Sequence, residues 1–161
     1  MNDRFKFRCG ITISHYDDDG NDIETLLLVN NVSIYDDGDV GFSRESLKEA
    51  VKRKNLSEEE ERTLWNSLDE YEVFEDWYQM PADFIEQCTG LKDKNGKLIY
   101  EGDLIKEPAN SHNLKVIWEN GAWQTEEYRK NGHREQLLYC LVNCYGVEIV
   151  GNIHENGELL K

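Results

Sequence analysis

The chain has 161 residues and a formal net charge of −15, because 33 acidic residues stand against 18 basic ones. This length holds one compact domain or two small ones, and the negative field argues against direct nucleic-acid binding and favours a partner with a basic surface. No stretch approaches the roughly 20 apolar residues of a transmembrane helix and the N-terminus lacks a signal-peptide pattern, so we expect a cytoplasmic protein without membrane association.

A first β-hairpin is predicted at the start of the chain. Apolar residues alternate between residues 4 and 14, which is the period of a strand with one buried face. The acidic run Asp17 to Asn21 supplies the turn, and Leu26 to Val29 form the returning strand.

A second acidic hairpin follows. Residues 32–35 and 40–42 are short apolar segments on either side of the turn Asp36 to Asp39. Between Arg8 and Arg44 there are eight acids and no base. Both turns are therefore predicted to present carboxylates that no nearby cation neutralises.

Two helices are predicted next. The first runs from Ser43 to about Asn55, and the second begins at Ser57, which with Glu60 forms a capping-box pattern. The second helix is predicted to extend to Pro81. Its expected packing stripe consists of Leu64, Trp65, Leu68, Tyr71, Phe74 and Tyr78.

Pro81 marks the only domain boundary that composition suggests. Residues 1–80 carry 20 acids and 9 bases (net −11), whereas residues 81–161 carry 13 and 9 (net −4). We therefore predict an acidic ββββαα segment over residues 1–80 and a separate β module over residues 81–161.

The second half has the pattern of a small β module. Turn signals at Asn95-Gly96, Gly102-Asp103 and Asn120-Gly121 alternate with short apolar segments. The expected strands include residues 104–106, 114–118, 122–128, 137–143 and 147–150. The fold class predicted for the whole chain is α+β, with acidic N-terminal hairpins and one or two helices followed by a small SH3-like β-barrel or curled sheet.

Several motifs in the second half also carry a resemblance to a known family. They are Thr89-Gly90-Leu91, Asp93-Lys94-Asn95-Gly96-Lys97, Ile99-Tyr100-Glu101-Gly102-Asp103, Gly151-Asn152-Ile153-His154-Glu155-Asn156 and Glu158-Leu159. With them, residues 83–161 resemble the YopX family of phage and prophage proteins. Gly157 departs from the family's usual proline. The resemblance implies phage origin, a host cytoplasm as compartment, and no assigned reaction.

The cysteines are the main candidates for metal ligands. Cys9, Cys88, Cys140 and Cys144 match the number of ligands in a closed zinc site, and His133 and His154 could join them. The spacing is poor, because in a strand Cys140 and Cys144 would lie about 13 Å apart. We therefore expect no cofactor, with reduced core cysteines favoured over zinc.

No catalytic residue is predicted, because the chain has no phosphate-loop, nucleophile-elbow or zincin motif. We therefore expect a protein that is not an enzyme.

The acidic side chains carry the functional hypothesis. Carboxylates on turns and along a helix can imitate a phosphate backbone and occupy a basic cleft, and the order of strand pairs and acidic helices is loosely similar in pattern to small acidic anti-CRISPR proteins. The expected partner is a host or anti-phage nucleic-acid-handling protein, such as a CRISPR nuclease, which the chain would inhibit. The alternatives are a homo-oligomeric structural or assembly protein of a phage, and a zinc-stabilised binding module. The expected partner-binding residues are Asp17, Asp18, Asp19, Asp22, Asp36, Asp37, Asp39, Glu58, Glu59, Glu61, Asp69, Glu70, Glu72, Glu75 and Asp76.

Overall fold

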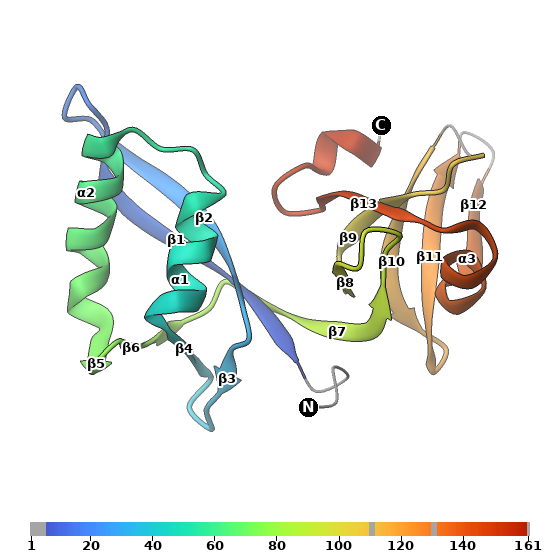
Figure 1. Ribbon diagram of the computed structural model, residues 1–161, viewed down its shortest axis with the longest axis horizontal. Coiled ribbons are helices and arrows are strands. Elements are labelled where there is room, and N and C mark those ends of the chain that lie inside the picture. The colour runs from blue at the N-terminus through green and yellow to red at the C-terminus, as the bar shows by residue number, and fades with distance from the viewer. Residues whose placement is uncertain (1–5, 110–111, 130–131, 161) are drawn as a thin grey trace. The chain divides into compact units, whose positions relative to one another are not determined.

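The structure is a computed structural model that describes residues 6–109, 112–129 and 132–160. These residues fall into two compact units, 6–85 and 86–160 (Figure 1). Both units combine strands with helices, so the predicted α+β class is confirmed. No helix in this part of the chain is long and apolar enough to cross a membrane.

The first unit is built on a long antiparallel hairpin. Strand β1 (Phe7–Tyr16) pairs with β2 (Asp22–Asn30) along its length, from Arg8 opposite Asn30 to Tyr16 opposite Asp22. Residues of β1 alternate between buried and exposed positions toward its end, as the period-two pattern predicted.

A second, smaller sheet completes the strands of this unit. Its order is β3-β4-β6-β5, formed by β3 (Ser33–Ile34), β4 (Asp39–Ser43), β6 (Trp77–Pro81) and β5 (Glu72–Phe74). The β3–β4 hairpin was predicted, whereas β5 and β6 were not.

Two helices pack on the hairpin, α1 (Arg44–Lys52) on β2 and α2 (Glu58–Leu68) on β1 (Figure 1). The capping box at Ser57 is present in full: the Ser57 hydroxyl accepts from the backbone N–H of Glu60, and the Glu60 carboxylate accepts from the backbone N–H of Ser57. These two bonds begin α2 where the sequence predicted it.

The predicted extension of α2 to Pro81 is wrong. The helix ends at Leu68, a 3₁₀ turn follows (Asp69–Tyr71), and the chain reverses at Asp76, whose φ is +57°. Aromatic residues that fit a helical stripe lie on strands instead, and Tyr78 stacks on Phe42 across β4 and β6. Strand β6 pairs with the backbone N–H and C=O groups along the open edge of β4. This pairing outweighs the local helical spacing of the aromatic residues.

The core of the first unit lies between the helices and the strands. Its buried apolar side chains are Cys9, Ile11, Ile13, Leu27, Val29, Val32, Val40, Phe42, Leu47, Ala50, Val51, Leu64, Leu68, Tyr78 and Met80.

The second unit begins with a hairpin and continues as a five-stranded antiparallel sheet. Strand β7 (Phe84–Lys92), which starts in the first unit, pairs with β8 (Leu98–Tyr100) around the predicted turn at Gly96. The larger sheet has the order β12-β11-β10-β9-β13. Its strands are β9 (Asp103–Lys106), β10 (Asn113–Glu119), β11 (Ala122–Arg129), β12 (Gly132–Leu137) and β13 (Glu148–Asn152), and a 3₁₀ turn follows at Gly157–Leu160.

The predicted strand over residues 137–143 is wrong, because Leu138–Tyr145 form the helix α3 against β11 and β12 (Figure 1). Leu138 and Leu141 are buried at helical spacing, and Gly146 ends the helix with a φ of +69°. A short apolar segment does not by itself distinguish a buried strand from a helix. These two leucines join the second core, whose other members are Ile99, Ile105, Leu114, Val116 and Val147.

Candidate functional site

The turn between β1 and β2 lies beside the start of α2. The Ser57 hydroxyl donates to Asp18 Oδ1 at 2.6 Å, and the Thr63 hydroxyl donates to the Tyr16 carbonyl at 2.7 Å. Two acidic segments that are distant in sequence therefore form one surface, which we call the acidic end (Figure 1). It consists of Asp17, Asp18, Asp19, Asp22, Glu58, Glu59 and Glu61.

Asp17 holds the β1–β2 turn in place. Its Oδ1 accepts from the backbone N–H groups of Asp19 at 3.0 Å and Asn21 at 2.8 Å. The side-chain amide of Asn21 also donates to this carboxylate and holds the pKa of Asp17 below its ordinary value. Asp17 is thus a fixed anion that organises the turn, while Asp19 and Asp22 are exposed beside it.

The carboxylates of α2 differ in what they contact. Glu59 pairs with Arg62 on the next turn, which raises the pKa of the arginine, and Glu61 accepts from the indole N–H of Trp65 at 3.2 Å. Acidic residues in a first helical turn are favoured by the helix dipole. The negative charge at this end therefore stabilises α2.

The acids of the second hairpin form a separate group. Asp37 accepts from the backbone N–H of Asp39, and Asp39 accepts from the side-chain amide of Gln79 at 3.4 Å. Together with Asp36, they sit where β4 begins, opposite Pro81.

A third group lies beyond the C-terminal end of α2 and at the β5–β6 turn. Arg44 Nη1 lies 3.9 Å from Glu72 and 3.7 Å from Asp76. The other members of this group are Asp69, Glu70 and Glu75. An α2 of 11 residues is about 16 Å long, so this group and the acidic end are separated by that distance.

Few of these carboxylates have a basic partner. Of the fifteen acids predicted to bind a partner, three form ion pairs with a basic side chain within the described residues. They are Glu59, Glu72 and Asp76. The remaining twelve have no lysine or arginine within 4 Å in the part of the chain that the structure describes. The acidic end in particular keeps an anionic surface.

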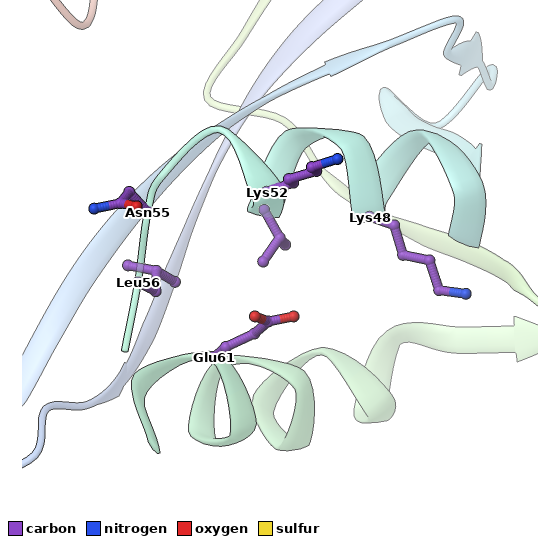
Figure 2. A pocket seen from close by; sticks show the side chains of 6 residues that line it. Lys48, Lys52, Asn55, Leu56 and Glu61 are labelled. Atoms are coloured by element: carbon purple, nitrogen blue, oxygen red, sulfur yellow. The ribbon is translucent and has the colours of Figure 1, made fainter. Parts of the chain in front are cut away.

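A hollow of about 370 Å³ lies between α1 and α2 (Figure 2). Glu61 points into it from α2, while Lys48, Lys52 and Leu56 line it from the α1 side. A second hollow, of about 340 Å³, lies in the second unit beside Trp118 and Trp123. Neither hollow gathers an acid, a base and a nucleophile from among the residues that the structure describes.

The motif residues of the second unit meet at a buried carboxylate that sequence reasoning missed. Asn152 Nδ2 donates to Glu86 Oε1 at 3.0 Å, and His154 Nε2 lies 3.5 Å from the same oxygen. Asn152 Oδ1 in turn accepts from the backbone N–H of His154 at 2.9 Å. This arrangement connects β7 to the C-terminal motif. Nothing near Glu86 in the sequence indicates it, because its partners lie 66 and 68 positions later.

The four cysteines are not gathered. Cys9 is in the core of the first unit and Cys88 is buried in the second, whereas Cys140 and Cys144 are exposed on α3. The side chain of His133 lies outside the described part of the structure. No group of three or more potential ligands comes together among the described residues. The distance of about 13 Å expected for the last two cysteines rested on a strand and does not apply to a helix.

Comparisons with known proteins give a family model and similar solved structures. The family model described as "YopX protein" matches residues 29–161, so it begins well before Asp83, where the motif resemblance started. The chain is similar to the crystal structure of protein EF1440 from Enterococcus faecalis, with 22% identity over 97% of each chain and a TM-score of 0.45. None of the curated proteins matches the chain.

Proposed function

The chain belongs to the YopX family of phage-type proteins, and from this premise we propose that it is a non-enzymatic interaction protein acting in the host cytoplasm. Its acidic end occupies the basic nucleic-acid site of a host or anti-phage protein and blocks that site. A CRISPR nuclease is one member of this partner class.

The hydrogen bond between Ser57 and Asp18 is the observation that carries the proposal. It joins the β1–β2 turn to the first turn of α2, so that carboxylates from two segments face solvent together. Solubility requires net charge but does not require that acidic segments converge. Convergence of carboxylates that are mostly without a basic partner is the arrangement that attracts a Lys/Arg-lined surface.

The length of α2 fits the same interpretation. The acidic end and the third acidic group are about 16 Å apart, which is close to five base steps of duplex DNA at about 3.4 Å each. A basic groove that holds a duplex could therefore contact both groups. Such an association is expected to weaken as salt rises, because the attraction is between exposed charges.

Charge reversal at the acidic end tests the proposal. The variant Asp19→Lys/Asp22→Lys/Glu58→Lys changes exposed carboxylates and leaves the Asp17 and Asp18 hydrogen bonds intact. The matched control is Glu107→Lys/Glu119→Lys/Glu158→Lys, which changes net charge equally in the second unit. Both proteins and the wild type are used to capture partners from host lysate, and captured proteins are then challenged with duplex DNA.

We expect the wild type and the control variant to capture a nucleic-acid-binding protein, and we expect duplex DNA to displace it. The acidic-end variant is expected not to capture this protein. Equal capture by both variants would contradict the assignment of the acidic end. Capture that DNA does not compete would contradict the proposed blocking of a nucleic-acid site.

A role in assembly as a homo-oligomer is the second candidate. The exposed apolar side chains of α3 favour it, because apolar surface of this kind is usually covered by another protein surface.

A further inference from the structure

Helix α3 presents two thiols on one exposed face. Cys140 and Cys144 are four residues apart and both are exposed, whereas Leu138 and Leu141 turn the opposite face into the core. Side chains at this spacing have Cβ atoms about 5–6 Å apart, one turn above the other. Two histidines at i and i+4 on one helical face bind zinc in other proteins, and two cysteines at this spacing likewise lie on one face.

The surface around these thiols is apolar. Leu137, Tyr139 and Tyr145 are 51%, 65% and 59% exposed. The whole of α3, Leu-Tyr-Cys-Leu-Val-Asn-Cys-Tyr, contains no charged residue, although 32% of the chain is charged. In so acidic a protein, this is a surface on which a second copy can approach without strong repulsion.

Two thiolates fill only half of a structural zinc site. Structural zinc is bound by four ligands in a tetrahedron, at about 2.3 Å for each Zn–S bond. The described residues offer no third His, Cys, Asp or Glu within reach. A second α3, related by a twofold axis, supplies the same two thiols again and completes the set.

We propose that Cys140 and Cys144 of two copies bind one Zn²⁺ ion and thereby join the copies through α3. Four thiols lose their protons to solvent as four Zn–S bonds form, and no electron is transferred. The exposed Tyr139 and Tyr145 then pack against the partner copy. This site is independent of the acidic end, and it differs from a zinc site within one chain because each copy contributes half of the ligands.

Metal titration of the full-length, reduced protein tests the proposal. Co²⁺ is added to chelator-treated protein while its tetrahedral absorption is followed, Zn²⁺ is then used to displace it, and the mass is measured by analytical ultracentrifugation. We expect saturation at one metal for two chains, and a dimer that a chelator returns to monomer.

The variants Cys140→Ser and Cys144→Ser are each expected to lose the tetrahedral cobalt signal and the metal-dependent dimer. Both positions are exposed, and circular dichroism verifies that the variants remain folded. The matched control is Asn143→Ala, which changes a neighbouring exposed residue and keeps both thiols, and it is expected to behave like the wild type.

The proposal would be overturned by saturation at one metal for each monomer, by a cobalt signal that survives both serine substitutions, or by a failure of the reduced protein to bind metal. A dimer that persists in chelator would also overturn it, because the apolar face alone would then account for the association.

Discussion

The hydroxyl of Tyr78 is buried without a hydrogen-bond partner among the described residues. The side chain is fully buried, its ring lies 6.2 Å from that of Phe42, and burial raises the pKa of Tyr78. Leaving a buried hydroxyl unsatisfied costs about 1–3 kcal/mol. We therefore expect Tyr78→Phe to raise the free energy of unfolding by about 1 kcal/mol, measured as a higher urea midpoint at unchanged m-value.

Tyr71→Phe is the matched control for this change. The Tyr71 hydroxyl is bonded to Glu70, which raises the pKa of the tyrosine, so its removal should not stabilise the protein. If Tyr78→Phe lowered the urea midpoint, the hydroxyl would have a partner that stabilises the fold.

Asp93 stabilises the β7–β8 turn as an anion. Its carboxylate accepts from the backbone N–H groups of Asn95 and Lys97, both at 2.9 Å, and of Ile149 at 3.3 Å. Burial alone would raise the pKa of Asp93, but these donors outweigh it and hold the pKa below its ordinary value. Because the folded pKa is below the unfolded value, the stabilisation is complete above about pH 4 and is lost as pH falls through the folded pKa.

Asp93→Asn is therefore expected to lower the free energy of unfolding at pH 7 by about 1–3 kcal/mol. It should also flatten the decline of stability below about pH 4, measured by urea unfolding between pH 7 and pH 3. Asp19→Asn, at an exposed position, serves as the control and should leave both quantities unchanged. An equally steep acid decline in both variants would show that Asp93 is not the group responsible.

Two glycines of the β7–β9 segment have different environments at similar backbone conformations. The φ angles are +82° at Gly96 and +77° at Gly102, so an alanine is strained at both. A Cβ at Gly96 would meet nothing within 4 Å, whereas a Cβ at Gly102 would lie 2.2 Å from Glu86 Oε1. Gly102 therefore allows the buried Glu86 carboxylate to approach the chain.

Gly96→Ala is expected to cost about 1–2 kcal/mol, from backbone strain alone. Gly102→Ala should cost at least about 2 kcal/mol more, because it also displaces a buried carboxylate from its partners. Thermal and urea unfolding measure the difference. Equal costs for the two variants would mean that Glu86 moves aside freely.

The helices show which elements could be predicted from the sequence. The start of α2 was predictable because the bonds of the capping box join residues only three positions apart. Its end was not, because the strand β6 pairs with β4, nearly 40 residues earlier in the chain. Helix α3 was missed for a related reason, since its two buried leucines are selected by a core that forms only in the folded unit.

The candidate site likewise combines features that the sequence predicts with contacts that it does not. Composition and turn patterns were sufficient to identify Asp17 to Asp19 and the start of α2 as acidic. Their convergence depends on the bond between Ser57 and Asp18, which joins positions 39 residues apart. Whether these carboxylates bind a partner stays a prediction. The Glu86 arrangement was missed because it exists only through contacts between distant motifs.

The two units have separate cores, but both carry a negative net charge. Residues 1–80 carry a net charge of −11 and residues 81–161 carry −4. Ion pairs such as Lys94 with Glu148, at 2.5 Å, neutralise only a few of these acids among the described residues. Repulsion between unpaired carboxylates therefore destabilises the folded state, which concentrates them.

Added salt is expected to stabilise the protein for this reason. Raising NaCl from 0.1 M to 1 M shortens the Debye length from about 10 Å to about 3 Å, which screens repulsion between exposed charges. We expect the melting temperature to rise by several degrees, since about 1 kcal/mol corresponds to such a shift for a chain of this size. The variant Asp22→Asn/Asp36→Asn/Glu75→Gln, which removes three exposed charges outside the first turn of α2, should begin at a higher melting temperature and respond less to salt. A melting temperature that fell with salt would show that attractive ion pairs outweigh the repulsion between carboxylates.

Partner binding through the acidic end should weaken over the same salt range. The two responses to salt therefore have opposite signs, which distinguishes repulsion within the protein from attraction to a partner.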